Sequence, residues 1–262
     1  MKTFFRVVLG LVPQLFIIQS YATECTKLVA YGNPEYPPYL WRSGKNPDSL
    51  VGANVAYLNE IDNEIKTSIK VRYGGTWARV QEEARYGRVD LIAGAFATEE
   101  RKKFLYYLEP AIANTRTLIW VDEKDPLHYT KWSDLQGLRG ITVINNSFGQ
   151  KFDAYAKSHL KISTVASLRQ AFEMLRKGRV RFLIYEEWPA RAFVQRYRIT
   201  GVKSLEPAIA EEPLYLVMAK KSPCATAEMR ERLVSAHQKV MKKNPMPNLL
   251  KENAELWDQN AN

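Results

Sequence analysis

The sequence predicts an α/β protein made of two similarly built lobes. Strand-like and helix-like segments alternate along most of the chain, which is the pattern of α/β proteins. A block of helix, glycine and short strand occurs twice, around residues 87–90 (GRVD) and around residues 178–181 (GRVR). Because ligands bind beyond the carboxyl ends of strands in open α/β sheets, two such lobes facing each other define a cleft between them.

The first half of the chain gives five elements in order. Thr76 is a helix-capping residue and Gly87 stands where that helix stops. The expected elements are a strand at 27–31, a helix at 55–69 with apolar residues at helical spacing, a strand at 70–73, a helix from Thr76 to Tyr86 and a strand at 89–93.

The second half repeats this order. Ser147 with Gln150, and Ser167 with Gln170, form capping-box patterns that open helices. The expected elements are a strand at 141–144, helices from these patterns to His159 and Lys177, a strand at 181–185, a helix at 191–198, a strand at 214–219 and helices at 225–242 and 248–257.

Residues 1–22 have the features of a secretory signal peptide. Lys2 and Arg6 supply the positive start, residues 7–18 form an apolar run, and residues 20–22 (SYA) provide a cleavage site. The alternative is an N-terminal membrane anchor, but the run is too short to cross a bilayer comfortably. We therefore expect an exported, soluble, periplasmic protein that begins near Thr23.

Removing these 22 residues from 262 leaves 240, enough for one large domain or two ordinary ones. The net charge then falls from +10 to +8, because the removed segment holds two basic and no acidic residues. A basic surface is typical of nucleic-acid-binding proteins. However, the charges are scattered, and an exported protein rarely meets nucleic acid. We therefore expect no nucleic-acid partner and a positive field that favours anionic partners.

The two cysteines, Cys25 and Cys224, stand near the two ends of the exported chain. In an oxidising compartment such a pair is more often bridged than free, the alternative being two unrelated buried residues. A bridge would close a loop of about 200 residues and stabilise the fold by roughly 5 kcal/mol in the chain-entropy model. The histidines, His128, His159 and His237, lie far apart with no metal-ligand spacing, so we expect neither metal nor cofactor.

Several motifs occur in a family-like order: YPPY at 36–39, GRVDLIAG at 87–94, TEER at 98–101 and SFG at 147–149. With them, essentially the whole exported chain resembles the extracellular solute-binding proteins of family 3, the amino-acid-binding proteins of ATP-driven (ABC) importers. This resemblance implies a type II periplasmic binding protein fold, a small-molecule ligand, an importer permease as partner and a monomer.

The same resemblance implies how the chain divides into lobes. Lobe 1 is expected to comprise residues 23–117 and 214–262, and lobe 2 residues 118–213. Two crossing segments, near residues 118–120 and 213–215, would form the hinge that absorbs domain closure. Cys25 and Cys224 then both belong to lobe 1, which makes a disulfide between them geometrically reasonable.

Arg101 matches the family's carboxylate-binding arginine. A planar guanidinium binds a carboxylate through two parallel, charge-assisted hydrogen bonds. The alternative reading is a solvated arginine within the charged run Glu99-Glu100-Arg101-Lys102-Lys103. By the same resemblance, Tyr36 and Trp77 are aromatic walls of the ligand site, with core packing as the alternative.

Other residues complete the expected site. Thr98 matches a donor beside the arginine. Ser147 and the amides around Phe148 and Gly149, at a helix start, match an anion site for the same carboxylate, although capping alone also explains Ser147. Glu186 aligns with the family's acidic residue that pairs with a ligand α-amine, and a solvated Glu186-Glu187 pair is the alternative.

The sequence departs from the family at three positions. Glu186 stands where the family favours the shorter aspartate. Phe96 replaces a small hydroxyl residue and narrows the cleft, and Arg79 adds a cation near the cleft mouth. These departures leave room for a small polar or carboxylate-bearing solute other than a standard α-amino acid.

Three functions compete. The leading hypothesis is capture of a small carboxylate-bearing solute, an amino acid or a relative, for an importer, without enzymatic activity. The second is a periplasmic enzyme on the same fold, such as a dehydratase of a cyclic carboxylic acid, with Glu186 or Glu187 as general acid. The third is the sensory module of a receptor, or a free sensory binding protein that docks on a receptor.

Overall fold

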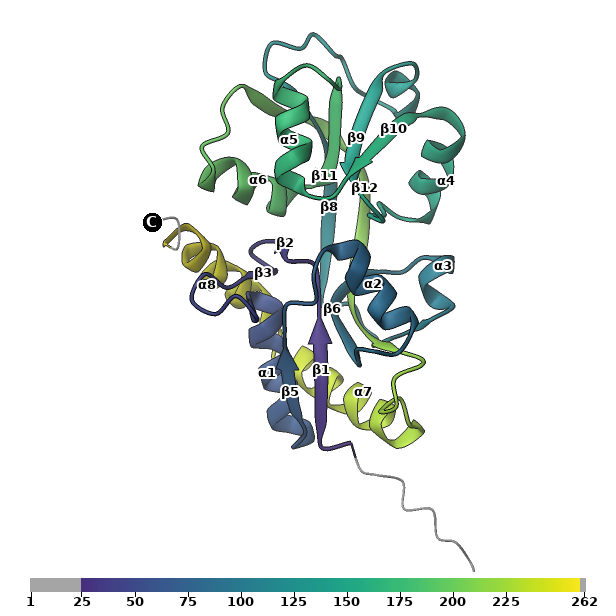
Figure 1. The fold of residues 1–262 in the computed structure, drawn as a ribbon, viewed down its shortest axis with the longest axis vertical. Helices are drawn as coiled ribbons and strands as arrows, with labels where there is room; N and C mark the ends of the chain where they lie inside the picture. The colour runs from purple at the N-terminus through teal and green to yellow at the C-terminus, as the bar shows by residue number, and fades with distance from the viewer. Residues whose placement is uncertain (1–24, 260–262) are drawn as a thin grey trace, which may run out of the picture.

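The computed structural model describes residues 25–259, so the predicted signal peptide lies outside the described residues. Figure 1 shows two α/β lobes, one above the other, joined by two long strands. These joining strands are β8 (Ala113–Asp122) and β12 (Val202–Ala219). The predicted α/β, two-lobed fold class is therefore confirmed.

The lower lobe, lobe 1, contains both ends of the described chain (Figure 1). Its strands are β1 (Lys27–Tyr31), β2 (Glu35–Tyr36), β3 (Leu40–Arg42), β4 (Leu50–Val51), β5 (Ser68–Val71), β6 (Leu91–Phe96) and β7 (Leu105–Tyr107). Its helices are α1 (Ala53–Ile65), α2 (Trp77–Arg85), α3 (Glu99–Lys102), α7 (Ala227–Lys242) and α8 (Met246–Gln259).

The upper lobe, lobe 2, is built from the middle of the chain (Figure 1). Its strands are β9 (Arg139–Val143), β10 (Lys161–Val165) and β11 (Phe182–Glu186). Its helices are α4 (Gln150–His159), α5 (Leu168–Arg176) and α6 (Glu187–Arg196), and a short 3-10 turn spans Trp132–Leu135. The strand β10 was not predicted.

One sheet runs through both lobes in the order β10-β9-β11-β8-β12-β6-β1-β5, and β7 also pairs with β12. Within lobe 1, β1 pairs in parallel with β5 and β6, and within lobe 2, β9 pairs in parallel with β10 and β11. The joining strands β8 and β12 are antiparallel to each other. Each lobe thus has the parallel core that βαβ units produce.

The register of the joining strands shows how the two predicted hinge segments lie in the sheet. Residues 118–120 do not lie opposite residues 213–215, because Pro213 pairs with Asn114 while Ile119 pairs with Leu205. The β12 segment near Leu214 pairs with β6 of lobe 1, and the β8 segment from Thr117 onward pairs with β11 of lobe 2. Between these two pairings, residues 115–116 face residues 211–212.

Local signals explain where two helices begin and end. The Thr76 side chain accepts a hydrogen bond from the Arg79 amide and caps α2, as predicted. The first helix ends earlier than predicted, because Lys66 adopts a left-handed conformation (φ 53°) and donates its amide to the Asp62 carbonyl. Ile69 consequently lies in β5 rather than on the helix, and its apolar side chain is buried there.

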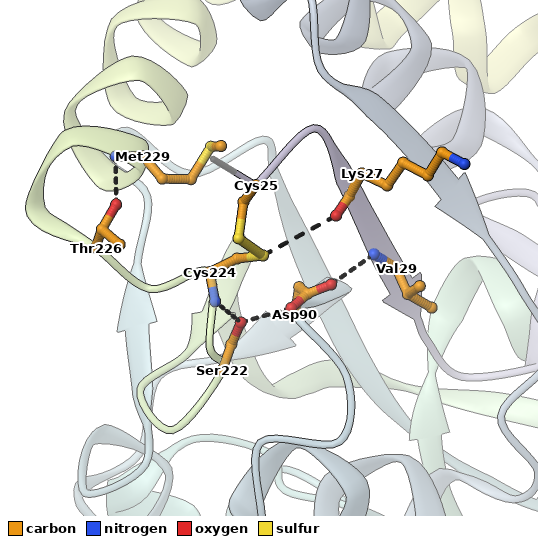
Figure 2. The surroundings of a disulfide bond; sticks show 8 residues. All are labelled: Cys25, Lys27, Val29, Asp90, Ser222, Cys224, Thr226 and Met229. Atoms are coloured by element: carbon orange, nitrogen blue, oxygen red, sulfur yellow. Dashed lines mark hydrogen bonds between the residues drawn. A yellow bond between two sulfur atoms is a disulfide. The ribbon is translucent and has the colours of Figure 1, made fainter. Parts of the chain in front are cut away.

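The predicted disulfide is present in lobe 1, beside the start of β1 (Figure 2). Cys25 and Cys224 are bonded, with their Cα atoms 5.6 Å apart and 199 residues between them in sequence. Beside the bridge, Asp90 accepts hydrogen bonds from the Val29 amide and the Ser222 hydroxyl, and Ser222 accepts one from the Cys224 amide. The bridge and this small network tie the start of β1 to the segment that follows β12.

A buried histidine joins two helices of lobe 1 to the segment before β8. Tyr57 of α1 hydrogen-bonds to His237 of α7 at 2.9 Å, and His237 is also 2.6 Å from the Pro110 carbonyl.

Within residues 25–259, no helix combines the length and apolar character needed to cross a membrane. In the same range, no group of three or more His, Cys, Asp or Glu side chains is arranged to hold a metal ion.

Candidate functional site

A small cleft lies between the two lobes. Its volume is about 20 Å³, room for about one water molecule. It is lined by residues from both lobes and the joining strands: Asn33, Tyr36, Trp77, Gly94, Ala95, Phe96, Arg101, Asn146, Glu186 and Leu214. Four of the six predicted ligand-binding residues, Tyr36, Trp77, Arg101 and Glu186, are in this set, whereas Thr98 and Ser147 are not.

Arg101 is buried despite standing in a charged run, with only 5% of its surface exposed. The alternative of a solvated side chain is therefore wrong. The run forms the short helix α3, whose N-cap is Thr98, and the Thr98 hydroxyl accepts the Arg101 amide at 3.1 Å. Thr98 thus holds the backbone of Arg101 in place, and the exposed acids and lysines of the run pair with one another.

Three hydrogen bonds hold the Arg101 guanidinium. Nε donates to Oε1 of Gln81 at 3.1 Å, Nη1 to the carbonyl of Phe96 at 3.3 Å, and Nη2 to the carbonyl of Asn145 in lobe 2 at 3.0 Å. The guanidinium carbon also lies 5.3 Å from the centre of the Trp77 ring. These bonds use three of the five N–H donors of the group, which leaves two for a carboxylate.

Glu186 brings a carboxylate into the same cleft from the end of β11. Only 2% of its surface is exposed, so it is not the solvated residue of the alternative reading. Its Oε2 accepts a long hydrogen bond of 3.5 Å from the Asn146 amide. Burial raises the pKa of Glu186 from 4.5 to about 7, and Arg101 lowers it only in part. The carboxylate is therefore poorly compensated by the protein itself.

Further polar atoms in and around the cleft lack hydrogen bonds. The Tyr36 hydroxyl, the Trp77 indole N–H and the Thr117 hydroxyl are buried and make no hydrogen bond within the described chain. Thr117 pairs with Glu186 in the register of β8 and β11, so it lies beside the cleft. Buried polar groups are nearly always satisfied in native proteins. A cluster of such groups is typical of a binding site for a polar ligand.

The structure corrects the role predicted for the Ser147 loop. Helix α4 begins at Gln150 after Gly149 (φ 93°), which is its N-cap, so Ser147 and Gln150 do not form a capping box. Instead Asp153 reaches back over the first turn. Its carboxylate accepts hydrogen bonds from the Ser147 hydroxyl and, at 2.9 Å, from the Phe148 amide, while the Gly149 amide donates to Ser147. Amides expected to be free for an anion are therefore occupied by the chain itself.

Two departures from the family have different outcomes. Phe96 is buried and lines the cleft, as expected for a residue that narrows it. Arg79 does not reach the cleft, because its side chain is 71% exposed and lies 3.8 Å from the Glu83 carboxylate on the outer face of α2.

The two lobes touch through hydrogen bonds around this cleft. Glu35 of β2 accepts the Leu168 amide, at the first turn of α5, at 2.8 Å. The Glu99 backbone N–H donates to Oε1 of the Gln150 side chain at 3.3 Å. Nε2 of the Gln81 side chain donates to the Asn145 carbonyl at 3.1 Å. Together with the bond from Arg101 to Asn145, these contacts describe a closed arrangement of the lobes.

A second, larger cavity adjoins the cleft and was not predicted. It has a volume of about 310 Å³ and shares Asn33 and Trp77 with the cleft. Its other walls come from segments that are far apart in sequence: Pro34, Glu35, Trp41, Arg42, Tyr73, Thr76, Val143, Ala166, Ser167, Phe193, Arg196, Tyr197 and Trp257. We call this cavity the outer chamber. No sequence signal beyond a local richness in aromatic residues pointed to it.

Two α/β lobes joined by two crossing strands, with a buried polar cleft between them, define a bilobal solute-binding protein. The sequence signature of the bacterial extracellular solute-binding proteins, family 3, matches residues 28–256, and the chain belongs to this family. No curated protein matches the chain in sequence.

Solved structures show the same fold at low sequence identity. Holo ArgBP from T. maritima has a TM-score of 0.69 at 20% identity, over 87% of this chain and 95% of that one. AbpA from Streptococcus pneumoniae, an amino acid ABC transporter substrate-binding protein bound to L-arginine, has 0.71 at 18%, over 88% and 96%. A histidine kinase sensor domain has 0.73 at 17%, over 86% and 95%.

Proposed function

We propose that this protein captures a small carboxylate-bearing solute, an amino acid or a close relative, in the cleft between its lobes and delivers it to an ABC importer. The observation that carries the proposal is the pair of opposite charges on the two lobes, Arg101 and Glu186, which line one buried cleft. A carboxylate on Arg101 and an ammonium on Glu186 would satisfy both groups at once.

The proposal includes the motion and the location. Lobe 1, as residues 23–117 and 214–262, and lobe 2, as residues 118–213, close on the solute as two bodies, and residues 1–22 direct export to the periplasm. A solute enters the open form, its carboxylate replaces the Asn145 carbonyl on Arg101, and closure excludes water. Exclusion of water strengthens the charged contacts inside the cleft. An amino acid transporter protein among the similar structures supports the importer role.

Binding to the exported chain, residues 23–262, tests this proposal. A thermal-shift screen of amino acids, organic acids and amines selects the solute that stabilises most, and calorimetry gives its affinity. Arg101→Ala is expected to abolish binding, while Arg79→Ala, an exposed arginine on the neighbouring helix, keeps it. Unchanged affinity in Arg101→Ala would rule out the carboxylate contact. Loss of uptake in a deletion strain tests the importer role.

Two observations favour other outcomes of the same experiments. The likeness to a histidine kinase sensor domain favours a sensory role, which a deletion strain with normal uptake but altered transcription would support. The pKa of Glu186, about 7, suits a general acid, and conversion of the bound solute to a product would support an enzyme. Stoichiometric binding without turnover supports the binding protein.

A further inference from the structure

The C-terminal helix α8 connects the two lobes at a place separate from the joining strands. It packs against α1 of lobe 1 and against α6 of lobe 2. Figure 1 shows its C-terminal end reaching toward α6, to one side of β8 and β12. This connection is non-covalent, so it can form and break while the joining strands stay intact. A rotation of the lobes about those strands has to strain or break it.

Trp257, in the last turn of α8, is the centre of this connection. Only 4% of its surface is exposed, although the ends of terminal helices usually fray. Its indole N–H donates to the Ala192 carbonyl of α6 at 3.0 Å. Its ring centre lies 5.4 Å from that of Trp41 in lobe 1 and 5.8 Å from that of Phe193 in lobe 2. One side chain therefore packs on both lobes at once.

Two more hydrogen bonds join the same two helices. Nε2 of Gln195 donates to Oδ2 of Asp258 at 2.9 Å, and Nη1 of Arg196 donates to the Trp257 carbonyl at 3.3 Å. The Arg196 guanidinium also lies 3.9 Å from the Trp257 ring centre. Residues 192, 195 and 196 are three and four positions apart, so they share one face of α6. That face is the one that holds the end of α8.

These contacts are complete without a solute, because every donor and acceptor in them is a group of the protein. None of their residues lines the cleft. The cleft itself is different, since the buried hydroxyls of Tyr36 and Thr117 make no hydrogen bond within the described chain. A solute can complete the cleft, but the contact between α6 and α8 gains nothing from it. The closed arrangement therefore has a source of stability that is independent of the solute.

We propose that the contact of Trp257 and Asp258 with α6 is a latch, which holds the ligand-free protein closed and has to open before a solute reaches the cleft. Because Trp257 also lines the outer chamber, release of the latch opens a wall of that cavity. The population of the open form then limits how much of the protein can accept a solute at any moment. This inference goes beyond the proposed function, since the latch acts in the absence of any solute.

Two backbone amides report opening of the lobes directly. The Leu168 amide donates to Glu35 and the Glu99 amide donates to Gln150, and both bonds run from one lobe to the other. These amides begin α5 and α3, so bonds within the helices do not use them. Opening exposes both to water, whereas the sheet keeps the amides of β9 protected. Hydrogen exchange by NMR measures this on residues 23–262, freed of carried-over solute by unfolding and refolding.

Trp257→Phe removes the indole N–H and keeps an aromatic ring. It is expected to raise the exchange rates of the Leu168 and Glu99 amides at least about fivefold and to leave those of β9 unchanged. Trp132→Phe is the matched control, because the Trp132 indole N–H also donates to a carbonyl at 3.0 Å, that of Ile209. Both partners of that bond belong to lobe 2, so this variant should not change exchange at either reporter amide.

If Trp257→Phe does not fold, the exposed Gln195 provides a second variant. Gln195→Ala removes the bond to Asp258 and is expected to raise the same two rates about twofold. Unchanged rates in the folded variants overturn the inference, and so does an equal rise in Trp132→Phe. An equal rise in β9 also contradicts it, because that pattern means general destabilisation. Since no solute is added, failure of the latch leaves the proposed function standing, and failure of solute binding leaves the latch standing.

Discussion

The Nη2 group of Arg101 donates a 3.0 Å hydrogen bond to the carbonyl oxygen of Asn145, which belongs to the opposite lobe. The guanidinium proposed to bind the solute therefore also holds the closed arrangement when the cleft is nearly filled by protein. Solute binding must exchange one acceptor for another, a backbone carbonyl for a carboxylate. Because a carboxylate accepts from two N–H groups and carries charge, this exchange favours the bound state.

Replacement of Arg101 by lysine separates charge from geometry. Lysine keeps the positive charge but lacks the planar fork, so it cannot form two parallel bonds to a carboxylate. We expect Arg101→Lys to bind the solute about 100-fold more weakly, corresponding to about 3 kcal/mol. Calorimetry measures this loss. Affinity within a factor of three of the unchanged protein would show that the fork has no role, provided that thermal unfolding shows a folded variant.

Glu186 makes the stability of the closed protein depend on pH. Its pKa is about 7 in the folded protein against an ordinary value of 4.5. Between these values the folded state binds more protons than the unfolded chain, so stability falls as the pH rises, by at most about 3 kcal/mol. Glu186→Gln removes this fall. Urea unfolding at pH 5 and pH 8 should therefore show a smaller difference in Glu186→Gln than in the unchanged protein.

The exposed Glu252 on α8 provides the control for that comparison. Glu252→Gln should keep the pH dependence of the unchanged protein, because its carboxylate is in contact with water. A Glu186→Gln variant with the same pH dependence as the unchanged protein would contradict the burial argument. A fall in the solute's affinity in Glu186→Gln above pH 7 would further support an ammonium partner.

The Glu35 carboxylate forms a second hydrogen bond between the lobes. Its bond to the Leu168 amide satisfies a donor in the first turn of α5 and places a negative charge near the helix N-terminus. We expect Glu35→Ala to destabilise the closed form by about 1 kcal/mol and to increase the radius of gyration of the ligand-free protein. Small-angle scattering measures this change. Glu35→Gln keeps an acceptor oxygen and should have a smaller effect, whereas equal radii for all three proteins would contradict the role of this bond.

The disulfide is expected to stabilise lobe 1 without affecting the cleft, because it joins the start of β1 to the segment after β12 and neither cysteine lines the cleft (Figure 2). In the chain-entropy model a loop of this length is worth roughly 5 kcal/mol. Cys25→Ser with Cys224→Ser should therefore unfold at a much lower temperature but bind the solute with unchanged affinity below that temperature. A variant that is equally stable, or one that is folded but binds weakly, would contradict this separation.

Much of the fold followed from local signals in the sequence. Thr76 and the glycine after α2 mark a helix whose hydrogen bonds lie within the segment, so its sequence alone predicts it. Of the two joining strands, only the end of β12 at residues 214–219 was predicted, because residues between 202 and 213 pair with residues about 90 positions away. Pairing over that distance is decided by the tertiary fold rather than by local preference.

Only part of the site was predicted, for the same reason. Arg101 stood out because a family motif marks it, although its charged neighbours favoured a surface position. Asp153 was missed, because its bond to the Ser147 hydroxyl depends on a side chain turning back over the first turn of α4. The outer chamber was missed because its walls, from Asn33 to Trp257, meet only after both lobes are assembled.

A crystal structure of the protein with its bound solute tests the central claim most directly. The account predicts a carboxylate within about 3 Å of the Arg101 guanidinium, in place of the Asn145 carbonyl, with both lobes in contact with the solute. A solute bound elsewhere, with the bond from Arg101 to Asn145 intact, would contradict it.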